Sequence, residues 1–369
     1  MSAGKITLAA LLLAASACKT GASLGGAAVK ISASSWPRAD ALFHKDPRWL
    51  GGDGAFSVDL GGDRTLWLFG DSFIATSAAN KRAESKMVRN SIAVQTGRDP
   101  AAAAIVFHWR QAGGAPASFF AEDGEAWFWP RHGLRVKTGL LLVLSWLVRD
   151  DDPESLGFRA AGWEARWVKD LDQPPPRWTL DKVAVPQVAF ALVGGVSLLA
   201  EGEHVYAYCV REPDSHDVVL LRWSRAKVEQ ADLLEPAWWM GSARGWVPHA
   251  ALGDRRPAVL LSGATGFSVS RPKALGGAYA YVQTDGFGAA DLVVRTAPRP
   301  EGPWSTPQKV YRPPESDRGG KVIVYAGKAH PQLTGADLVA TYAANSLDFS
   351  QLVRDATLYY PRMVRITIE

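Results

Sequence analysis

The residues most able to carry chemistry in this sequence are two aspartates that flank one short hairpin, Asp53 and Asp71. Two apolar runs of strand length, 55–60 and 65–69, are separated by a Gly-Gly-Asp turn, which predicts an antiparallel hairpin. Opposed residues in such a hairpin have a constant index sum, and a turn centred on Gly62 gives 124, the sum of 53 and 71. The two aspartates are therefore predicted to lie opposite each other, with Cα atoms roughly 5 Å apart.

Two carboxylates this close have a definite chemical consequence. Like charges repel, so one of the pair should hold its proton more tightly than a free carboxyl group. A protonated carboxyl beside an ionised one is what glycoside hydrolysis requires, and a separation of about 5 Å favours retention of configuration. The structural alternative is that Asp53 caps a turn and Asp71 accepts backbone hydrogen bonds at a strand end. Asp59, in mid-strand, and Asp63, in the turn, are predicted to face solvent.

The elements that must position this pair are β-strands. Helix-period patterns are scarce, whereas short β-type runs bounded by Gly and Pro recur along the chain. These runs are 55–60, 65–69, 91–95, 105–109, 127–129, 139–148, 188–199, 205–210, 218–223, 258–261, 277–282, 291–296, 338–342 and 364–368. Many short strands with almost no helix indicate a sandwich, a barrel or a propeller.

The spacing of the strand pairs favours the propeller. Pairs recur at roughly 60 to 70 residues, the length of a four-stranded blade with its loops. Dividing the mature chain by this spacing predicts about five blades, so the predicted fold is an all-β, five-bladed β-propeller. The predicted blades are 50–115, 116–172, 173–245, 246–315 and 316–369. The segment 31–44 is predicted to supply a strand that closes the ring with the last blade.

The composition limits the partners. With 47% hydrophobic and 21% charged residues, the 369-residue chain has the composition of a globular protein, and its net charge of +4 forms no basic stripe for nucleic acid. No glycine-rich phosphate loop, serine nucleophile elbow or zinc-type Cys/His spacing occurs. We expect no catalytic metal, no cofactor and no nucleic-acid partner; an ion in the central channel is left open. The acidic run 150–152 is predicted to be a solvated loop, with calcium binding as the alternative.

The N-terminus is predicted to direct export. An apolar run at 6–17, too short to span a bilayer, follows Lys5 and predicts a signal peptide at 1–17. Small residues before Cys18 predict a lipidated N-terminal cysteine, with ordinary cleavage after residue 17 as the alternative. The Gly/Ala-rich segment 18–30 is predicted to be a flexible tether and 31–369 the propeller. The other cysteine, Cys209, lies in an apolar run and is predicted to be a buried small hydrophobe.

Several segments together resemble a known bacterial family. They are 52–57, 66–74, 89–94, 127–130, 302–305, 330–331, Asn345 and 359–362, and they span nearly all of the mature chain. The sequence resembles five-bladed propellers of the domain-of-unknown-function type 4185, which include endo-D-arabinanases and are similar in architecture to arabinanase and xylosidase propellers. The resemblance implies a glycoside hydrolase with two catalytic aspartates, at the positions of Asp53 and Asp71, that cleaves a furanose-type or other cell-wall polysaccharide.

Further candidate residues surround this pair. The candidates for substrate binding are Arg89, Asn90, Trp129, His132, His330 and Asn345. Arg89 and Asn90 could orient one aspartate and bind sugar hydroxyls, and Trp129 could stack on a sugar face. The alternatives are a charged loop end for Arg89, core packing for Trp129 and a satisfied structural histidine for His330.

The sequence also departs from the pattern that the resemblance implies. Arg131 and His132 stand where an acidic residue is expected after Trp-Pro, and Gly266 and Gln332 also replace acidic positions. A divergent or inactive member is therefore possible, and the rival hypothesis is a non-catalytic carbohydrate-binding or surface-scaffold propeller. In either case the expected partner is a polysaccharide or oligosaccharide, with membrane contact only through the lipid anchor. The protein itself is expected to be a monomer.

Overall fold

The structure is a computed structural model that describes residues 29–153, 155–213 and 215–369. The predicted signal peptide, the acylated Cys18 and the tether up to residue 28 lie outside the described residues. No helix within the described part is long and apolar enough to cross a membrane.

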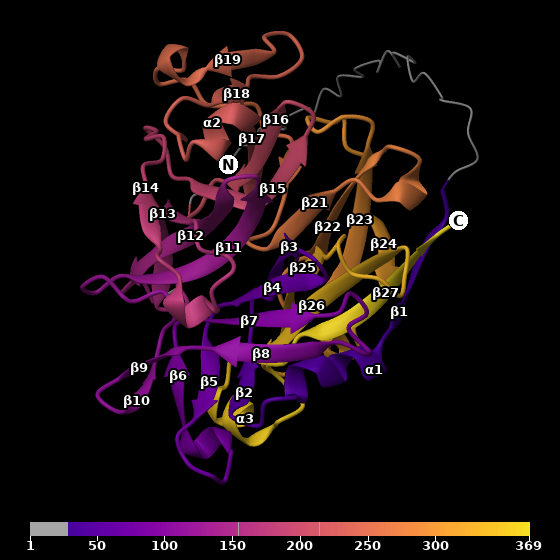
Figure 1. Cartoon of the computed structure of the whole chain (residues 1–369). Coiled ribbons are helices and arrows are strands. Elements are labelled where there is room, and N and C mark those ends of the chain that lie inside the picture. The colour runs from indigo at the N-terminus through magenta and orange to yellow at the C-terminus, as the bar shows by residue number, and fades with distance from the viewer. Residues whose placement is uncertain (1–28, 154, 214) are drawn as a thin grey trace, which may run out of the picture.

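Strands dominate the fold, and five of the seven sheets in the described residues have four or more strands. Figure 1 shows these five sheets following one another around the molecule in chain order. The first strand of each of the five sheets contacts the first strand of the next, in the order β3, β11, β15, β21 and β25. This arrangement is that of a propeller, and the predicted all-β propeller fold is confirmed.

Each of the five sheets forms one blade, written here from its inner to its outer strand. Blade 1 contains β3 (Phe56–Gly61), β4 (Arg64–Phe69), β7 (Ser91–Thr96) and β8 (Ala104–His108). Blade 2 contains β11 (Trp127–Val136), β12 (Gly139–Arg149), β13 (Phe158–Val168) and β14 (Asp181–Val183). Blade 3 contains β15 (Val193–Glu201), β16 (His204–Val210), β17 (Asp217–Ser224), β18 (Ala237–Trp239) and β19 (Trp246–Pro248), and β20 (Leu261–Ser262) also pairs with β17.

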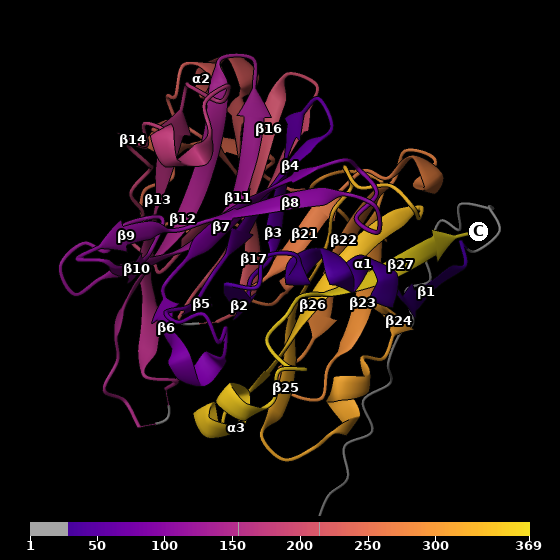
Figure 2. The same ribbon diagram turned by 60° about the horizontal axis from the view of Figure 1, so that its bottom comes forward.

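The remaining two blades complete the circle. Blade 4 contains β21 (Phe267–Ser270), β22 (Tyr279–Asp285), β23 (Asp291–Ala297) and β24 (Gln308–Tyr311). Blade 5 contains β25 (Val322–Ala329), β26 (Leu338–Ser346), β27 (Arg362–Ile368) and β1 (Ile31–Ser35). Figures 1 and 2 both show β1 beside β27, so the start of the domain closes the last blade as predicted.

Shorter elements decorate the blades. Two small sheets consist of β2 (Trp49–Gly52), β5 (Ser72–Ala75) and β6 (Ser85–Val88), and of β9 (Arg110–Ala112) and β10 (Ala115–Ala117). The helices are α1 (Pro37–Asp40), α2 (Arg225–Glu229) and α3 (Phe349–Arg354), and the 3-10 turns are η1 (Ala41–His44), η2 (Arg82–Glu84), η3 (Pro175–Arg177), η4 (His249–Ala251), η5 (Lys273–Leu275) and η6 (Pro314–Asp317).

The observed blades differ from the predicted cuts in their middle part. The cut at 172–173 was wrong because β14, which follows a proline-rich turn, still pairs with β13 of blade 2. The cut at 245–246 was wrong because β19 pairs with β18, so blade 3 carries an additional hairpin. Both strands are only three residues long, too short to give a clear two-residue period.

Alternation along the strands gives each blade two packing faces. In β4, Leu66 and Leu68 join the hydrophobic cluster shared with blade 2, while Trp67 and Phe69 join the cluster around α1 and η1. The side chains are fully buried on both faces, and successive residues of a strand point to opposite sides. The face-to-face packing of apolar blades therefore accounts for most of the core.

A ring of side-chain hydrogen bonds joins all five inner strands. We call this the inter-blade ring; its side chains are Ser57, His132, Ser197, Ser268 and His330. The contacts around it are Ser57 Oγ with His330 Nδ1 (2.6 Å), His132 Nε2 with the Ser57 carbonyl (3.0 Å), the Leu198 amide to His132 Nδ1 (2.9 Å), the Val269 amide to Ser197 Oγ (2.9 Å), and the Ala329 amide to Ser268 Oγ (2.7 Å). Each bond crosses from one blade to its neighbour, so the ring fixes the inner strands against one another.

Candidate active site

The first hairpin is broken where the two predicted catalytic aspartates lie. Phe56 pairs with Leu68 in β3 and β4, and Gly52 pairs with Ser72 in β2 and β5; both pairs have the predicted index sum of 124. Asp53 and Asp71 lie between these two paired segments. The Gly70 amide donates to the Asp53 carbonyl (3.0 Å), and the Asp53 amide donates to the Asp71 carbonyl (3.4 Å). The register thus brings the two aspartates together as expected.

The local backbone is specialised on both sides of the break. Gly54 and Ala55 have φ of 81° and 45°, a left-handed conformation that turns the chain out of the regular strand. At Gly70 an added Cβ would lie 2.5 Å from Asp53 Oδ1, so only glycine allows the Asp53 carboxylate to approach. The tight turn of the hairpin also has left-handed residues, Gly62 at 54° and Asp63 at 62°, as a two-residue hairpin turn requires.

Asp71 is the carboxyl group most favourable to a bound proton. Trp129 donates its indole N–H to Oδ1 (3.0 Å), and Arg89 forms an ion pair with Oδ2 (3.4 Å). Burial and the neighbouring Asp53 charge nevertheless raise the pKa of Asp71 to about 7, because they outweigh both contacts. Its side chain stays 16% exposed, so a ligand could still reach it.

Asp53 has a different set of neighbours. The Tyr325 hydroxyl donates to Oδ2 (2.6 Å), and Asn345 in turn donates to the Tyr325 oxygen (3.1 Å). Burial raises the pKa of Asp53, while the Tyr325 hydrogen bond and the positive charges of Lys328 and Arg131 oppose this rise. The two carboxyl groups therefore have unequal surroundings: two cations act on Asp53, and one cation and one anion act on Asp71.

A cavity of about 190 Å³ opens beside this pair. Its lining residues are Trp129, Arg131, Leu147, Phe158, Ala160, Glu212, Pro213, His216 and Thr265. Trp129 connects it to Asp71 through the indole hydrogen bond, and the Trp129 ring meets Phe158 edge-on at 4.7 Å. The cavity thus combines an aromatic wall with charged groups. A second cavity of about 400 Å³ lies between blades 1 and 2 and includes neither aspartate.

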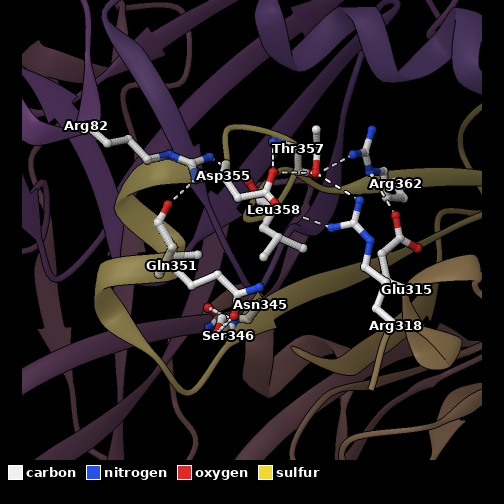
Figure 3. Close-up of polar contacts among 11 residues, drawn as sticks. Arg82, Glu315, Arg318, Asn345, Ser346, Gln351, Asp355, Thr357, Leu358 and Arg362 are labelled. Atoms are coloured by element: carbon white, nitrogen blue, oxygen red, sulfur yellow. Dashed lines mark hydrogen bonds and ion pairs between the residues drawn. The ribbon is translucent and has the colours of Figure 1, made fainter. Parts of the chain in front are cut away.

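The loop from β26 to β27 supports the Asp53 side of the site. The Tyr359 carbonyl accepts a hydrogen bond from Gly52, the residue before Asp53 (2.8 Å). Arg82 is buried and donates to the carbonyls of Leu50, Leu352, Asp355 and Leu358 at 2.5–3.0 Å, so a single guanidinium joins β2 to this loop. Figure 3 shows Arg82 reaching toward the loop around α3, with Asn345 at its start.

Two of the predicted substrate-binding residues have structural contacts instead. Asn90 is fully buried; its amide nitrogen donates to the carbonyls of Phe120 (3.0 Å) and Phe128 (2.9 Å), and its oxygen accepts the Phe120 amide (2.7 Å). His330 is also fully buried and is held by Ser57 and by Thr341 (2.8 Å). Neither side chain has hydrogen-bonding capacity or surface left for a sugar, so the structure places both in the scaffold.

His132 also belongs to the scaffold more than to the cavity. Ser57 must accept and Leu198 must donate, so these two backbone contacts assign the ring proton to Nε2. Burial lowers the pKa of His132 to about 4, and the ring is neutral in the physiological range. The candidates that do lie next to the aspartates are Arg89, Trp129 and, through Tyr325, Asn345.

Sequence reasoning missed Tyr325, Lys328 and Glu212. Tyr325 and Lys328 lie on β25, where the pairing with β26 shifts register, and such a bulge has no clear sequence signal. Glu212 lines the cavity, accepts a hydrogen bond from Thr265 (2.7 Å) and lies 3.5 Å from His216. It is an acidic residue of the site in blade 3, which a search at the expected positions did not find.

The three departures from the family pattern have physical counterparts here. Arg131 is buried, donates to Ser145 and to the Thr265 carbonyl (3.2 Å), and so links blades 2 and 4. A Cβ at Gly266 would lie 3.3 Å from Ala326, so the bulge in β25 occupies the space that a side chain there would need. Gln332 donates to Ser57 Oγ (2.7 Å) and thereby joins the inter-blade ring.

Within the described ranges, no group of three or more His, Cys, Asp or Glu side chains is arranged to hold a metal ion. The acidic run at 150–152 lies in the loop between β12 and β13. Asp59 and Asp63 face solvent as predicted, with side chains 53% and 77% exposed.

The fold and the site together define an all-β propeller with a carboxylate pair at the first hairpin of its first blade. The family described as a domain of unknown function (DUF5005) matches residues 38–368, and the chain belongs to this family. This match does not confirm the finer resemblance to type 4185. Among curated proteins, no relative matches the chain.

Solved structures share the fold at low identity. One from Bacteroides ovatus ATCC 8483, described as a "putative hydrolase", is 17% identical, covers 91% of this chain and 90% of its own, and has a TM-score of 0.70. The catalytic domain of a Coprinopsis cinerea GH62 alpha-L-arabinofuranosidase is 10% identical over 88% and 93% of the two chains, with a TM-score of 0.48. A thermostable family-43 glycoside hydrolase is 12% identical over 86% and 88%, with a TM-score of 0.43.

Proposed function

We propose that this protein is a glycoside hydrolase that cleaves a furanose-type or other cell-wall polysaccharide with Asp53 and Asp71. The observation that carries the proposal is the break in the first hairpin, which brings two partly exposed carboxyl groups together in unequal electrostatic surroundings. Glycoside hydrolysis needs one carboxyl group that donates a proton and one that is ionised.

The unequal surroundings assign the two roles. Asp71, with its pKa raised to about 7 by burial and by Asp53, is protonated in mildly acidic solution and acts as general acid toward the leaving-group oxygen. Asp53 accepts the Tyr325 hydrogen bond and is surrounded by Lys328 and Arg131, so it supplies the negative charge as nucleophile or base. Trp129 and Arg89 hold the Asp71 carboxyl in orientation.

The cavity beside the pair supports a carbohydrate substrate. Its volume of about 190 Å³ is below the roughly 300–1,000 Å³ of pockets for drug-sized ligands, which suits one sugar ring. Trp129 and Phe158 supply the apolar faces on which sugar rings stack, while Arg131, Glu212 and His216 supply hydrogen-bonding groups. The blade 1 segments that resemble endo-D-arabinanase propellers favour a furanose.

The test is hydrolysis of arabinans, galactans and xylans by the wild type, Asp71→Asn and Asp59→Asn, followed by release of reducing ends. Asp59 lies on the same hairpin but faces solvent, which makes it a matched control. We expect activity on at least one polymer in the wild type and in Asp59→Asn, and its loss in Asp71→Asn. An Asp71→Asn variant as active as the wild type would overturn the mechanism, and binding without cleavage would favour the carbohydrate-binding alternative.

The stereochemistry gives a second readout from the same reaction. The paired strand ends predict retention of configuration, because a short carboxyl separation leaves no room for a water molecule between acid and sugar. Proton NMR of the first products should show the anomer of the substrate. An inverted anomer would exclude a nucleophilic role for Asp53 and make it a general base.

For the N-terminus we propose export and lipid anchoring through Cys18, which follows small residues at the end of an apolar run. The full-length precursor should yield a membrane-associated mature protein, and Cys18→Ser should release it into the soluble fraction. Membrane association that survives Cys18→Ser would contradict the anchor.

A further inference from the structure

Lys328 is a buried lysine whose position depends on an irregular strand. Residues 325 and 328 would point to opposite faces of a regular strand, since they are three positions apart. In β25 the register shifts between Tyr325 and Lys328, and Ala326 within the bulge has φ of 57°. As a result Tyr325 contacts Asp53 and Lys328 contacts the carbonyl of Gly54, the next residue.

The bulge is held in place by its neighbours. A Cβ at Gly327 would lie 2.6 Å from the Leu292 side chain and 2.7 Å from the Thr284 backbone nitrogen, so blade 4 packs directly against it. Ala326 closes it from within, since its carbonyl accepts a second hydrogen bond from Lys328 Nζ (2.6 Å). A lysine placed this rigidly holds a fixed charge next to the candidate site.

The surroundings of the Lys328 ammonium group contain one negative charge. Its Nζ lies over the Phe56 ring at 4.3 Å, and the side chain is 1% exposed. The titratable and charged groups that face it are Asp53 from the hairpin, Arg131 and His132 from β11, and His330 at the end of β25. No carboxylate of the described residues forms an ion pair with it, so its charge is balanced only through Asp53.

We propose that Lys328 is a positioning residue of the candidate active site, which holds the backbone beside Asp53 and supplies the positive charge that keeps Asp53 ionised while Asp71 stays protonated. This inference rests on the proposed function. A buried cation with two carbonyl acceptors and no direct counter-ion is costly to the fold, and an uncharged side chain would fill the same space at lower cost. Such costs are typical of functional sites.

The charge of Lys328 has a predictable effect on the pH profile. Burial lowers the pKa of Lys328 to about 7, even though Asp53 opposes this, and the pKa of Asp71 is also about 7. Below pH 7 the lysine is charged and Asp71 is protonated, which is the combination that the reaction needs. Above pH 7 both protons leave, so activity falls on the alkaline side, while protonation of Asp53 limits it on the acidic side.

The test compares pH–rate profiles of the wild type, Lys328→Gln and Lys328→Arg on the polymer that the wild type cleaves. An opposite charge nearby lowers a carboxyl pKa by about 1–3 units. We therefore expect the acidic limb of Lys328→Gln to move up by about one pH unit or more and kcat at pH 5 to fall about tenfold or more. Lys328→Arg should restore the acidic limb, and Lys321→Gln, at an exposed lysine of the same blade, should match the wild type.

Carboxyl NMR titration of Asp53 provides a readout that does not depend on hydrolysis. The pKa of Asp53 should rise in Lys328→Gln and stay unchanged in Lys321→Gln, whether or not any polymer is cleaved. If the wild type cleaves nothing, the proposed function fails while this titration still tests Lys328. An unchanged Asp53 titration in a folded Lys328→Gln variant, or a lower kcat with both limbs in place, would overturn the proposal.

Discussion

Two groups of polar side chains line the inner strands, and they differ in how completely they are satisfied. In the inter-blade ring, His330 and His132 each use both ring nitrogens, and the serines accept backbone amides of the next blade. At the carboxylate pair, burial and mutual repulsion leave the pKa of Asp71 raised to about 7 despite its hydrogen bond and ion pair. A satisfied polar group stabilises the fold, whereas a group whose charge is disfavoured holds a proton that can be transferred.

This contrast separates the residues that polar character alone cannot separate. His330, Asn90 and Asp71 are all polar residues at the inner side of blades, but only Asp71 keeps an exposed, incompletely balanced charge. We therefore expect substitutions in the two groups to move stability and activity in opposite ways. The predictions below would break the comparison if both groups responded alike.

The largest effect is expected from Asp71→Asn. Loss of a general acid lowers kcat by about 10²–10⁴-fold. The pKa of Asp71 is higher in the folded than in the unfolded chain, so its stabilising contribution is complete below about pH 4 and is lost as pH rises through about 7. Asn removes this loss, and the variant should melt higher than the wild type at pH 8 and show less decline between pH 4 and pH 8.

Thermal melts of both proteins across that pH range measure the difference directly. Asp59→Asn, which changes an exposed carboxylate in the same blade, should follow the wild-type curve. A melting temperature of Asp71→Asn below that of the wild type at pH 8 would show that Asp71 stabilises the fold and belongs with the ring.

A smaller effect, of the opposite kind, is expected from His330→Ala. It leaves Ser57 and Thr341 without their buried partner and opens a cavity beside Trp67, so the free energy of unfolding should fall by about 2–4 kcal/mol. Urea unfolding gives this value, and kcat per folded molecule should stay within about twofold of the wild type. His204→Ala, at a less buried histidine of blade 3, is the control and should change stability by less than about 0.5 kcal/mol.

Two asparagines that sequence reasoning treated alike should now separate. Asn90→Ala removes three hydrogen bonds to buried backbone groups and should cost about 1–3 kcal/mol of stability without changing KM. Asn345→Ala removes the contact to Tyr325, whose hydroxyl bonds Asp53, and should lower kcat about tenfold at a stability cost of about 1 kcal/mol or less. If Asn90→Ala lowered kcat while Asn345→Ala only destabilised the fold, the assignment of the two residues would be reversed.

How much of this could be read from the sequence follows from the range of the interactions. The register that brings Asp53 opposite Asp71 depends on a two-residue period and a tight turn, both local, so it could be predicted and was correct in β3 and β4. The closing strand β1 was also foreseen, because a β-type segment before blade 1 has only the last blade left to pair with. The signals of the propeller fold are of the same local kind, repeated along the chain.

The remaining parts of the site depend on contacts between distant blades. Tyr325 reaches Asp53 across 272 positions, and only because a bulge turns β25 at that point. Conversely, His330 and Asn90 have the residue types of a binding site, and their use as scaffold residues depends on partners in other blades or loops. A polar residue on an inner strand can serve either purpose, and the sequence does not show which of its partners come within reach.

The smallest effect is expected from Phe287→Ala, at the edge of the carboxylate pair. Phe287 is 57% exposed in the loop between β22 and β23, and its ring lies 5.8 Å from that of Tyr325. An exposed ring contributes little to stability, so the free energy of unfolding should change by less than about 0.5 kcal/mol. If the ring stacks on a sugar next to the cleavage site, its removal should raise KM about three- to tenfold and leave kcat nearly unchanged, since aromatic contacts contribute about 0.5–1.5 kcal/mol. Leu234→Ala, an exposed apolar residue of blade 3, should change neither quantity, and an unchanged KM in Phe287→Ala would limit substrate contact to the cavity on the Trp129 side.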